Sequence, residues 1–270
     1  MYCYQRAANL LPLLVLLTAC SEPVIVRQSM NRMVLPESEG SYTMSISGQT
    51  AGGYKVEYPG TQLAADLDSG DVEKIATIPG FSATYGVHRD IDLTLLFEAA
   101  RDDGGSLVSS PTARVKYQLL GSNQLRATQG DWSLAVTASH AYNADSEYSN
   151  NINFWSSVFG WDDEPNPDVE VWYEHSEYAL IGGYRPLHTV LLYGGTFWGR
   201  YTTGMRVDYG GVITRDRAMY EVYGNNIGVA WLPIVDLSFI AELCATRYEW
   251  GNYRDTGWSF GLRVEKEFFF

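Results

Sequence analysis

The last stretch of the chain, residues 258–270, alternates between apolar and polar side chains at almost every position. Side chains on a β-strand point to opposite faces in turn, so a period of two residues predicts a strand with one apolar and one polar face. Lys266 interrupts the apolar face. The other members of this face are Trp258, Phe260, Leu262, Val264, Phe268 and Phe270.

The same two-residue period recurs from residue 40 onward, and no heptad or long helical period accompanies it. About ten strands are predicted. The clearest are 80–87, 91–99, 113–119, 132–139 and 258–270, and weaker ones are 41–48, 169–184, 188–201, 221–232 and 236–249. Long and short connections alternate between them, and the longer ones are 49–79, 100–112, 142–168, 202–220 and 250–256.

An even number of strands joined by alternately short and long connections resembles the β-barrels of the bacterial outer membrane. The resemblance implies an all-β fold over residues 40–270: a closed antiparallel up-and-down transmembrane β-barrel with short periplasmic turns and long extracellular loops. With an even strand count, both termini are expected on the periplasmic side. The terminal aromatics Phe268 and Phe270 resemble the signal read by the machinery that inserts such barrels, so this machinery is an expected partner.

Alternation alone does not separate a membrane barrel from a soluble one, because a soluble up-and-down barrel turns its apolar face inward. The aromatic carboxyl end favours the membrane. So do the tryptophans and tyrosines near predicted strand ends, and small residues such as Ser133 and Thr137 on the polar faces. A mean hydropathy of −0.17 is no objection, because barrel strands satisfy one another's backbone groups and need only one apolar face.

In this orientation the polar faces line the lumen, where acids and bases can pair. A barrel of this size is more often filled by its own side chains than open. We therefore expect a plugged lumen that contains a charge network. Its expected members are Asp92, Glu98, Arg114, Lys116, Glu242, Arg263, Glu265 and Glu267.

The amino terminus, residues 1–20, has the pattern of an export signal. Its apolar run, residues 10–17, is too short to span a bilayer as a helix. The tetrad Leu17-Thr18-Ala19-Cys20 that ends it resembles the lipobox of bacterial lipoproteins. This resemblance implies a signal peptide over 1–19, lipid on Cys20 in the inner leaflet of the outer membrane, and a tether over 20–39. The alternative is an ordinary secretory signal.

Charge and the number of cysteines limit the partners and the crosslinks that the chain can have. A formal net charge of −13 and a pI near 4.7, with no basic stripe, argue against nucleic acid as a partner. Of the cysteines other than Cys20, Cys3 leaves with the signal and Cys244 stays alone, so no disulfide is expected within the mature chain. No phosphate-binding glycine loop, zinc spacing or EF-hand loop is present, and we expect no cofactor and no metal.

The run Glu174-His175-Ser176-Glu177 contains the residue types of a Ser-His-acid triad, as in the lipid A deacylases of the outer membrane. On one strand, however, His175 and Ser176 point to opposite faces, and a nucleophile must lie within hydrogen-bond reach of its base. Omptin-like proteases are a second comparison, but the long connections hold acidic residues and no histidine. We therefore expect no catalytic residues and no enzymatic activity.

The function expected from the sequence is that of a lipid-anchored outer-membrane barrel with a structural or surface-interaction role. Outer-membrane lipid and lipopolysaccharide are its expected partners. Three alternatives stay open: a narrow channel for small solutes or ions, a barrel enzyme acting on lipid or peptide, and a periplasmic lipid-tethered carrier with an apolar interior.

Overall fold

The computed structural model of the chain describes residues 24–58, 72–101, 107–145, 168–209, 212–234, 236–250 and 253–269. These residues form eleven β-strands in one sheet. The strands are β1 (Val24–Ser29), β2 (Thr43–Tyr58), β3 (Val72–His88), β4 (Ile91–Arg101), β5 (Leu107–Leu120), β6 (Trp132–Asp145), β7 (Asp168–Leu187), β8 (Val190–Tyr209), β9 (Val212–Ile234), β10 (Leu237–Trp250) and β11 (Tyr253–Phe269). None of the described residues belongs to a helix long and apolar enough to cross a membrane.

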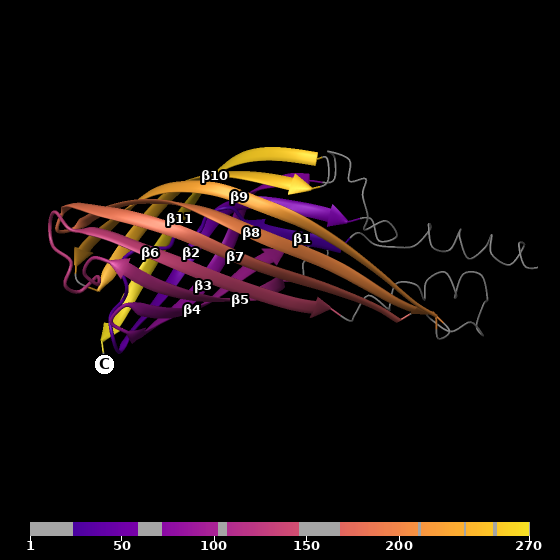
Figure 1. Cartoon of the computed structure of the whole chain (residues 1–270), viewed down its shortest axis with the longest axis horizontal. Helices are drawn as coiled ribbons and strands as arrows, with labels where there is room; N and C mark the ends of the chain where they lie inside the picture. Colours follow the sequence, from indigo (N-terminus) through magenta and orange to yellow (C-terminus); the bar gives the residue numbers. More distant parts are fainter. Residues whose placement is uncertain are drawn as a thin grey trace, which may run out of the picture.

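Strands β2 to β11 close into a barrel (Figure 1). Each pairs antiparallel with the next along the chain, and β11 pairs back with β2 in a register from Phe269 opposite Thr43 to Gly261 opposite Ala51. Because the ring is closed, the backbone groups of each strand are satisfied by its neighbours. The predicted closed antiparallel barrel of ten strands is confirmed.

The apolar face of the barrel wall points outward and the polar face inward. On β11, Trp258 is 77% exposed and Leu262 is 47% exposed, whereas Arg263 and Glu265 are buried at 7% and 1%. A soluble barrel has the reverse arrangement, and a wall of this kind is typical of a barrel that faces hydrocarbon. The largely polar interior also argues against a carrier with an apolar cavity.

β8 continues well beyond its predicted end and β9 begins well before its predicted start, whereas β7 lies close to its predicted range of 169–184. β7, β8 and β9 have 20, 20 and 23 residues, whereas about 9–11 residues cross a bilayer. Most of 202–220, predicted to be a long loop, is therefore strand. Figure 1 shows these three strands in orange, reaching far beyond the rest of the wall at one end. We call this end the far end, and the opposite end, where β3 turns into β4 and β7 into β8, the near end.

The chain before the barrel also differs from the prediction of a tether over 20–39. Residues 24–29 form β1, which pairs with the far end of β2, from Val24 opposite Tyr58 to Ser29 opposite Gly53. β11 pairs with β2 only as far as Ala51, so β1 follows on from β11 along the same edge of β2. Residues 20–23 lie outside the described part.

The described chain consequently begins and ends at opposite ends of the barrel. Val24 lies at the far end beside Tyr58, and Phe269 lies at the near end beside Thr43. The expectation that both termini share one side assumed ten passages across the wall. β1 and the residues after it add an eleventh passage, which reverses the side on which the described chain starts.

Candidate functional site

Residues 30–39, here called the inner segment, run through the interior from the far end toward the near end. All ten residues are buried. The segment enters where the backbone N–H of Met30 donates to the carbonyl oxygen of Gly52. It leaves where the backbone N–H of Tyr42 donates to the carbonyl oxygen of Gly86, close to the turn between β3 and β4.

Glu242 on β10 holds the first part of the inner segment. Its carboxylate accepts hydrogen bonds from the backbone N–H groups of Arg32 at 2.8 Å and Met33 at 3.0 Å. The same carboxylate accepts the side-chain amide of Asn226 at 2.7 Å and the hydroxyl of Tyr193 at 3.0 Å. A buried carboxylate with several donors is well satisfied without a cation, and here two of those donors belong to the inner segment.

The side chain of Arg32 binds another part of the wall. Its Nε donates to Glu177 Oε1 on β7 at 2.6 Å, and its Nη2 pairs with the other oxygen of the same carboxylate. The guanidinium also lies 4.1 Å from the ring centroid of Phe197, and the hydroxyl of Tyr201 donates to Glu177 at 3.1 Å. This bidentate geometry is the strong form of an arginine–carboxylate pair, and it connects the segment to β7 and β8.

A second bidentate pair lies toward the near end. Glu37 of the inner segment accepts Nε of Arg185 at 2.7 Å and also pairs with its Nη2, and both side chains are buried. Lys116 on β5 donates to the carbonyl oxygens of Leu35 and Glu37 and pairs with Asp92 at 2.8 Å. Since β5 and β7 lie on different parts of the wall, these bonds hold the segment from several sides.

The wall carries glycine where the inner segment approaches most closely. A Cβ placed on Gly86 would overlap the carbonyl oxygen of Gly40, the residue that directly follows the inner segment. One placed on Gly183 would lie 2.6 Å from Cγ of Pro36. These two positions of the wall therefore leave no room for a larger residue unless the segment moves.

The eight residues predicted to form a lumen charge network fall in different places. Asp92, Arg114, Lys116, Glu242, Arg263, Glu265 and Glu267 are buried in the interior, whereas Glu98 is half-buried. The structure brings Lys116 to Asp92 and Arg263 to Glu265, and Arg263 also donates to the carbonyl oxygen of Met33 at 2.9 Å. Glu242 bonds mainly to backbone amides and neutral side chains.

Sequence reasoning missed the residues that belong to the inner segment and two of their partners on the wall. Glu177 and Arg185 share the inward face of β7, so the two-residue period of that strand contained a signal for them. Arg32, Glu37 and Glu39 carried no such signal, because the inner segment has no regular period. Phe268 lies exposed on the outer wall, and Phe270 and Cys20 lie outside the described residues.

The sequence run around His175 does not form a triad. His175 stacks on Tyr201, with ring centroids 5.0 Å apart. Ser176 instead contacts a histidine across strands, because its Oγ lies 3.1 Å from Nδ1 of His140 on β6. No carboxylate among the described residues is hydrogen-bonded to His140, so the group that would orient a catalytic histidine is missing from this part of the chain.

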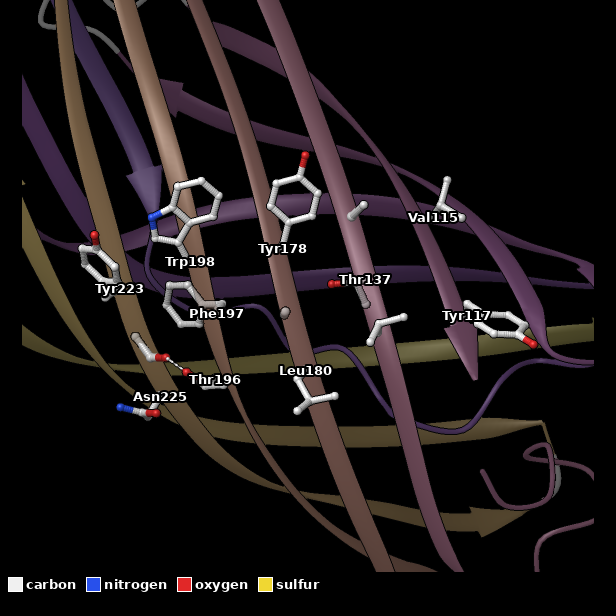
Figure 2. Close-up of a pocket in the computed structure, with 14 residues that line it drawn as sticks. Val115, Tyr117, Thr137, Tyr178, Leu180, Thr196, Phe197, Trp198, Tyr223 and Asn225 are labelled. Carbon is white, nitrogen blue, oxygen red and sulfur yellow. Dashed lines mark hydrogen bonds between the residues drawn. The ribbon is translucent and has the colours of Figure 1, made fainter. Parts of the chain in front are cut away.

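An apolar groove of about 640 Å³ lies on the outer wall. Figure 2 shows side chains of five neighbouring strands, β5 to β9, along it. Tyr178 and Trp198 stack within it, with ring centroids 5.9 Å apart. Because Tyr178, Leu180 and Tyr223 in its lining point outward, the groove opens toward the surroundings of the barrel.

No protein-family model and no curated protein sequence matches the chain. Solved structures similar to it include Ail, the attachment invasion locus protein of Yersinia pestis, with 12% identity, 84% of this chain and 99% of that chain covered, and a TM-score of 0.33. The amino-terminal β-barrel domain of Pseudomonas aeruginosa OprF gives 12% identity, 85% and 99% coverage, and a TM-score of 0.33. Neisserial surface protein A has 12% identity, with 85% of this chain and 98% of that chain covered, and a TM-score of 0.32. Similarity at this level says nothing about what this chain binds or does.

Proposed function

We propose that this chain is an outer-membrane barrel closed by its own inner segment, with a structural or surface-interaction role. The observation that carries the proposal is the set of buried bonds from residues 30–39 to the wall, above all the two backbone amides held by Glu242. We infer that a segment bonded on several sides blocks the passage of ions through the lumen. The outward apolar face and the exposed Phe268 at the carboxyl end support the membrane location.

The surface role is supported by the strands that extend beyond the membrane-spanning height. β7, β8 and β9 are about twice as long as a membrane crossing requires. Paired strands form a stiff platform, which suits contact with a partner outside the membrane better than a loop of the same length does. The far end is thus the proposed interaction surface.

Conductance in planar bilayers tests the closure. Wild-type protein is expected to be electrically silent, because the inner segment fills the lumen. A variant with Glu37→Ala, Arg32→Ala and Glu242→Ala loses the three main anchors and is expected to show conductance steps. A variant with Leu262→Ala, on the outer wall, is the matched control and should stay silent. Steady conductance by the wild-type barrel would overturn the proposal and favour the narrow channel.

We also propose that Cys20 is lipidated, but at the far end. Three residues separate Cys20 from Val24, and four peptide units reach about 14 Å at most. The hydrocarbon layer is about 30 Å thick, so this reach cannot return the lipid to the near side. The acyl chains would therefore enter the leaflet at the far end, and not the inner leaflet that the sequence predicts.

Labelling with radioactive palmitate tests the lipid. The label is expected in wild-type protein and in Cys244→Ala, and it should disappear in Cys20→Ala. An epitope inserted after Ser21 is expected to bind antibody on intact cells. Detection only after permeabilisation would contradict the far-end position, and a label that persists in Cys20→Ala would contradict the lipid itself.

A further inference from the structure

The apolar groove on the outer wall follows two rows of paired residues across five strands. The first row runs from Val115 on β5 through Ala138, Tyr178 and Trp198 to Tyr223 on β9. The second row, one step toward the near end, consists of Tyr117, Val136, Leu180, Thr196 and Asn225. Both rows line the groove, whose volume of about 640 Å³ falls within the range of about 300–1,000 Å³ that is typical of small-molecule sites.

The groove is hollow because a small residue stands between larger ones. Ala138 lies opposite Val115 on one side and Tyr178 on the other. Figure 2 shows the rings of Tyr178, Trp198 and Tyr223 along the same row. The hydrocarbon layer of a membrane contains no water that could fill such a hollow. A hydrocarbon chain is therefore the expected occupant.

A polar row borders the groove on the side of the far end. It contains Arg200 on β8, which stands opposite Glu221 on β9, and it continues through Glu249 to Arg254 on β11. The guanidinium of Arg200 lies 5.7 Å from the ring centroid of Trp198 in the groove. Apolar side chains thus give way to charged ones from one row to the next. Tryptophan and tyrosine at such a boundary are typical of a membrane interface.

Basic residues exceed acidic ones along this border. Arg200 pairs with Glu221, and Glu249 pairs with both Arg247 and Arg254. Among the described residues of the border, three arginines thus accompany two glutamates. One positive charge remains in excess, although the whole chain has a formal net charge of −13. The next two rows of β7 to β9 add one acid and one base and keep this excess, through Glu174 and Arg217.

The arginines of the border are accessible to a ligand. The side chains of Arg200, Arg247 and Arg254 are 54%, 47% and 67% exposed. Ion pairs as exposed as these contribute little free energy, so an arginine can exchange its carboxylate for another anion at small cost. A guanidinium presents its donors in a planar fork that fits a phosphate group.

We propose that the groove and the arginines beside it bind lipid A, with one acyl chain in the groove and a phosphate at Arg200. Because Arg200 lies over Trp198, at the edge of the groove, one molecule can make both contacts. The choice of lipid A over a phospholipid rests on the proposed function, which places the far end outside the cell, where the outer leaflet contains lipid A. A second barrel is a poorer occupant, since it leaves the excess positive charge without an anion.

Native mass spectrometry of the refolded barrel tests the site. Protein refolded from inclusion bodies into detergent is free of lipopolysaccharide. It is titrated with purified lipid A, with dephosphorylated lipid A and with phosphatidylglycerol. Ala138→Leu fills the groove, and Arg200→Gln removes the positive charge. Their matched controls are Ala83→Leu on the outward face of β3 and Arg89→Gln in the turn between β3 and β4. The heat-dependent gel shift checks the folding of each variant.

The wild type is expected to retain one lipid A per chain and to bind the other two lipids about tenfold more weakly or worse. Ala138→Leu should weaken binding of lipid A and of its dephosphorylated form alike, by about tenfold. Arg200→Gln should weaken binding of lipid A alone, by about the same factor, and so abolish the preference for the phosphorylated form. Both controls should bind as the wild type does.

Three results would overturn the inference: equal retention of lipid A and phosphatidylglycerol, unchanged binding of lipid A in both Ala138→Leu and Arg200→Gln, or a protein dimer that Ala138→Leu dissociates. The outcome is independent of the conductance test. A silent barrel that does not retain lipid A removes this inference alone, and a conducting barrel that retains lipid A removes only the proposed closure.

Discussion

The carboxylate of Glu242 accepts a hydrogen bond from the backbone N–H of Met33 across 209 residues of sequence. The donor is backbone, so the contact requires a particular path of the inner segment and no particular side chain at position 33. The contact does require a carboxylate at position 242 of the wall. Changes in the wall are therefore expected to cost more than conservative changes in the segment.

Replacing Glu242 by alanine should strongly destabilise the barrel. The change leaves the amides of Arg32 and Met33 and the hydroxyl of Tyr193 without an acceptor, and each buried unsatisfied group costs about 1–3 kcal/mol. Urea unfolding in detergent should show the loss. Glu249→Ala removes two ion pairs at the rim, with Arg247 and Arg254, and should cost less than about 1 kcal/mol. Equal effects of the two substitutions would contradict the role of Glu242.

The pair of Arg185 and Glu37 should show strong coupling. Removing one partner leaves an uncompensated buried charge, which costs about 3–5 kcal/mol. Removing both with Arg185→Met and Glu37→Leu should cost clearly less than the sum of the single changes. A double-mutant cycle of unfolding free energies measures the difference, and simple additivity would show that the two side chains do not interact.

Gly86 should not tolerate a methyl group. A Cβ at this position would overlap the carbonyl oxygen of Gly40, so Gly86→Ala must displace the backbone as the chain leaves the lumen. Overpacking of this kind costs about 1–3 kcal/mol. Gly48 has open space around its missing Cβ, which makes Gly48→Ala the control, with an expected change of less than about 1 kcal/mol. Equal urea midpoints of unfolding for the two variants would refute the close approach at Gly86.

Acid should weaken the turn between β9 and β10 through Asp236. The hydrogen bond from Lys266 lowers the pKa of Asp236 below its usual value of 3.8. A carboxyl whose pKa is lower in the folded state stabilises the fold above its unfolded pKa, and this contribution disappears as the pH falls through the folded value. Wild-type stability should therefore fall more than that of Asp236→Asn between about pH 5 and pH 2. Parallel pH profiles would show that the pair contributes nothing.

The contact between Ser176 and His140 should have no catalytic consequence. No acidic group among the described residues orients His140, although the two side chains lie 3.1 Å apart. Mass spectra of lipid A from cells with wild-type protein, Ser176→Ala or no protein are expected to agree. A missing acyl chain that appears only with the wild type would reveal a hydrolase and contradict the expectation of no enzymatic activity.

The wall of the barrel was predictable from sequence because its signal is local. The alternation from Trp258 to Val264 contains both the strand and its two faces, and burial on β11 follows it residue by residue. The ends of β8 and β9 were not predictable in the same way, since 202–220 lacks a clear alternation and its strands form by pairing with each other.

The position of the inner segment could not be predicted from the sequence for a different reason. Arg32 and Glu177 are separated by 145 residues, and no short stretch of sequence contains both members of the pair. The contact of Ser176 with His140 likewise depends on the register of β6 against β7, in which the two residues stand opposite each other. Periodicity within one strand does not determine register between strands.

A disulfide between the inner segment and the wall tests the central claim most directly. Asn31 and Ser259 are hydrogen-bonded inside the barrel, whereas Phe260 points outward from the next position of β11. In a Cys244→Ala background, Asn31→Cys with Ser259→Cys should form a disulfide in the folded protein, seen by mass spectrometry of non-reduced peptides. Asn31→Cys with Phe260→Cys should not. Free thiols in the first pair, or equal crosslinking in both, would show that residues 30–39 do not lie in the lumen.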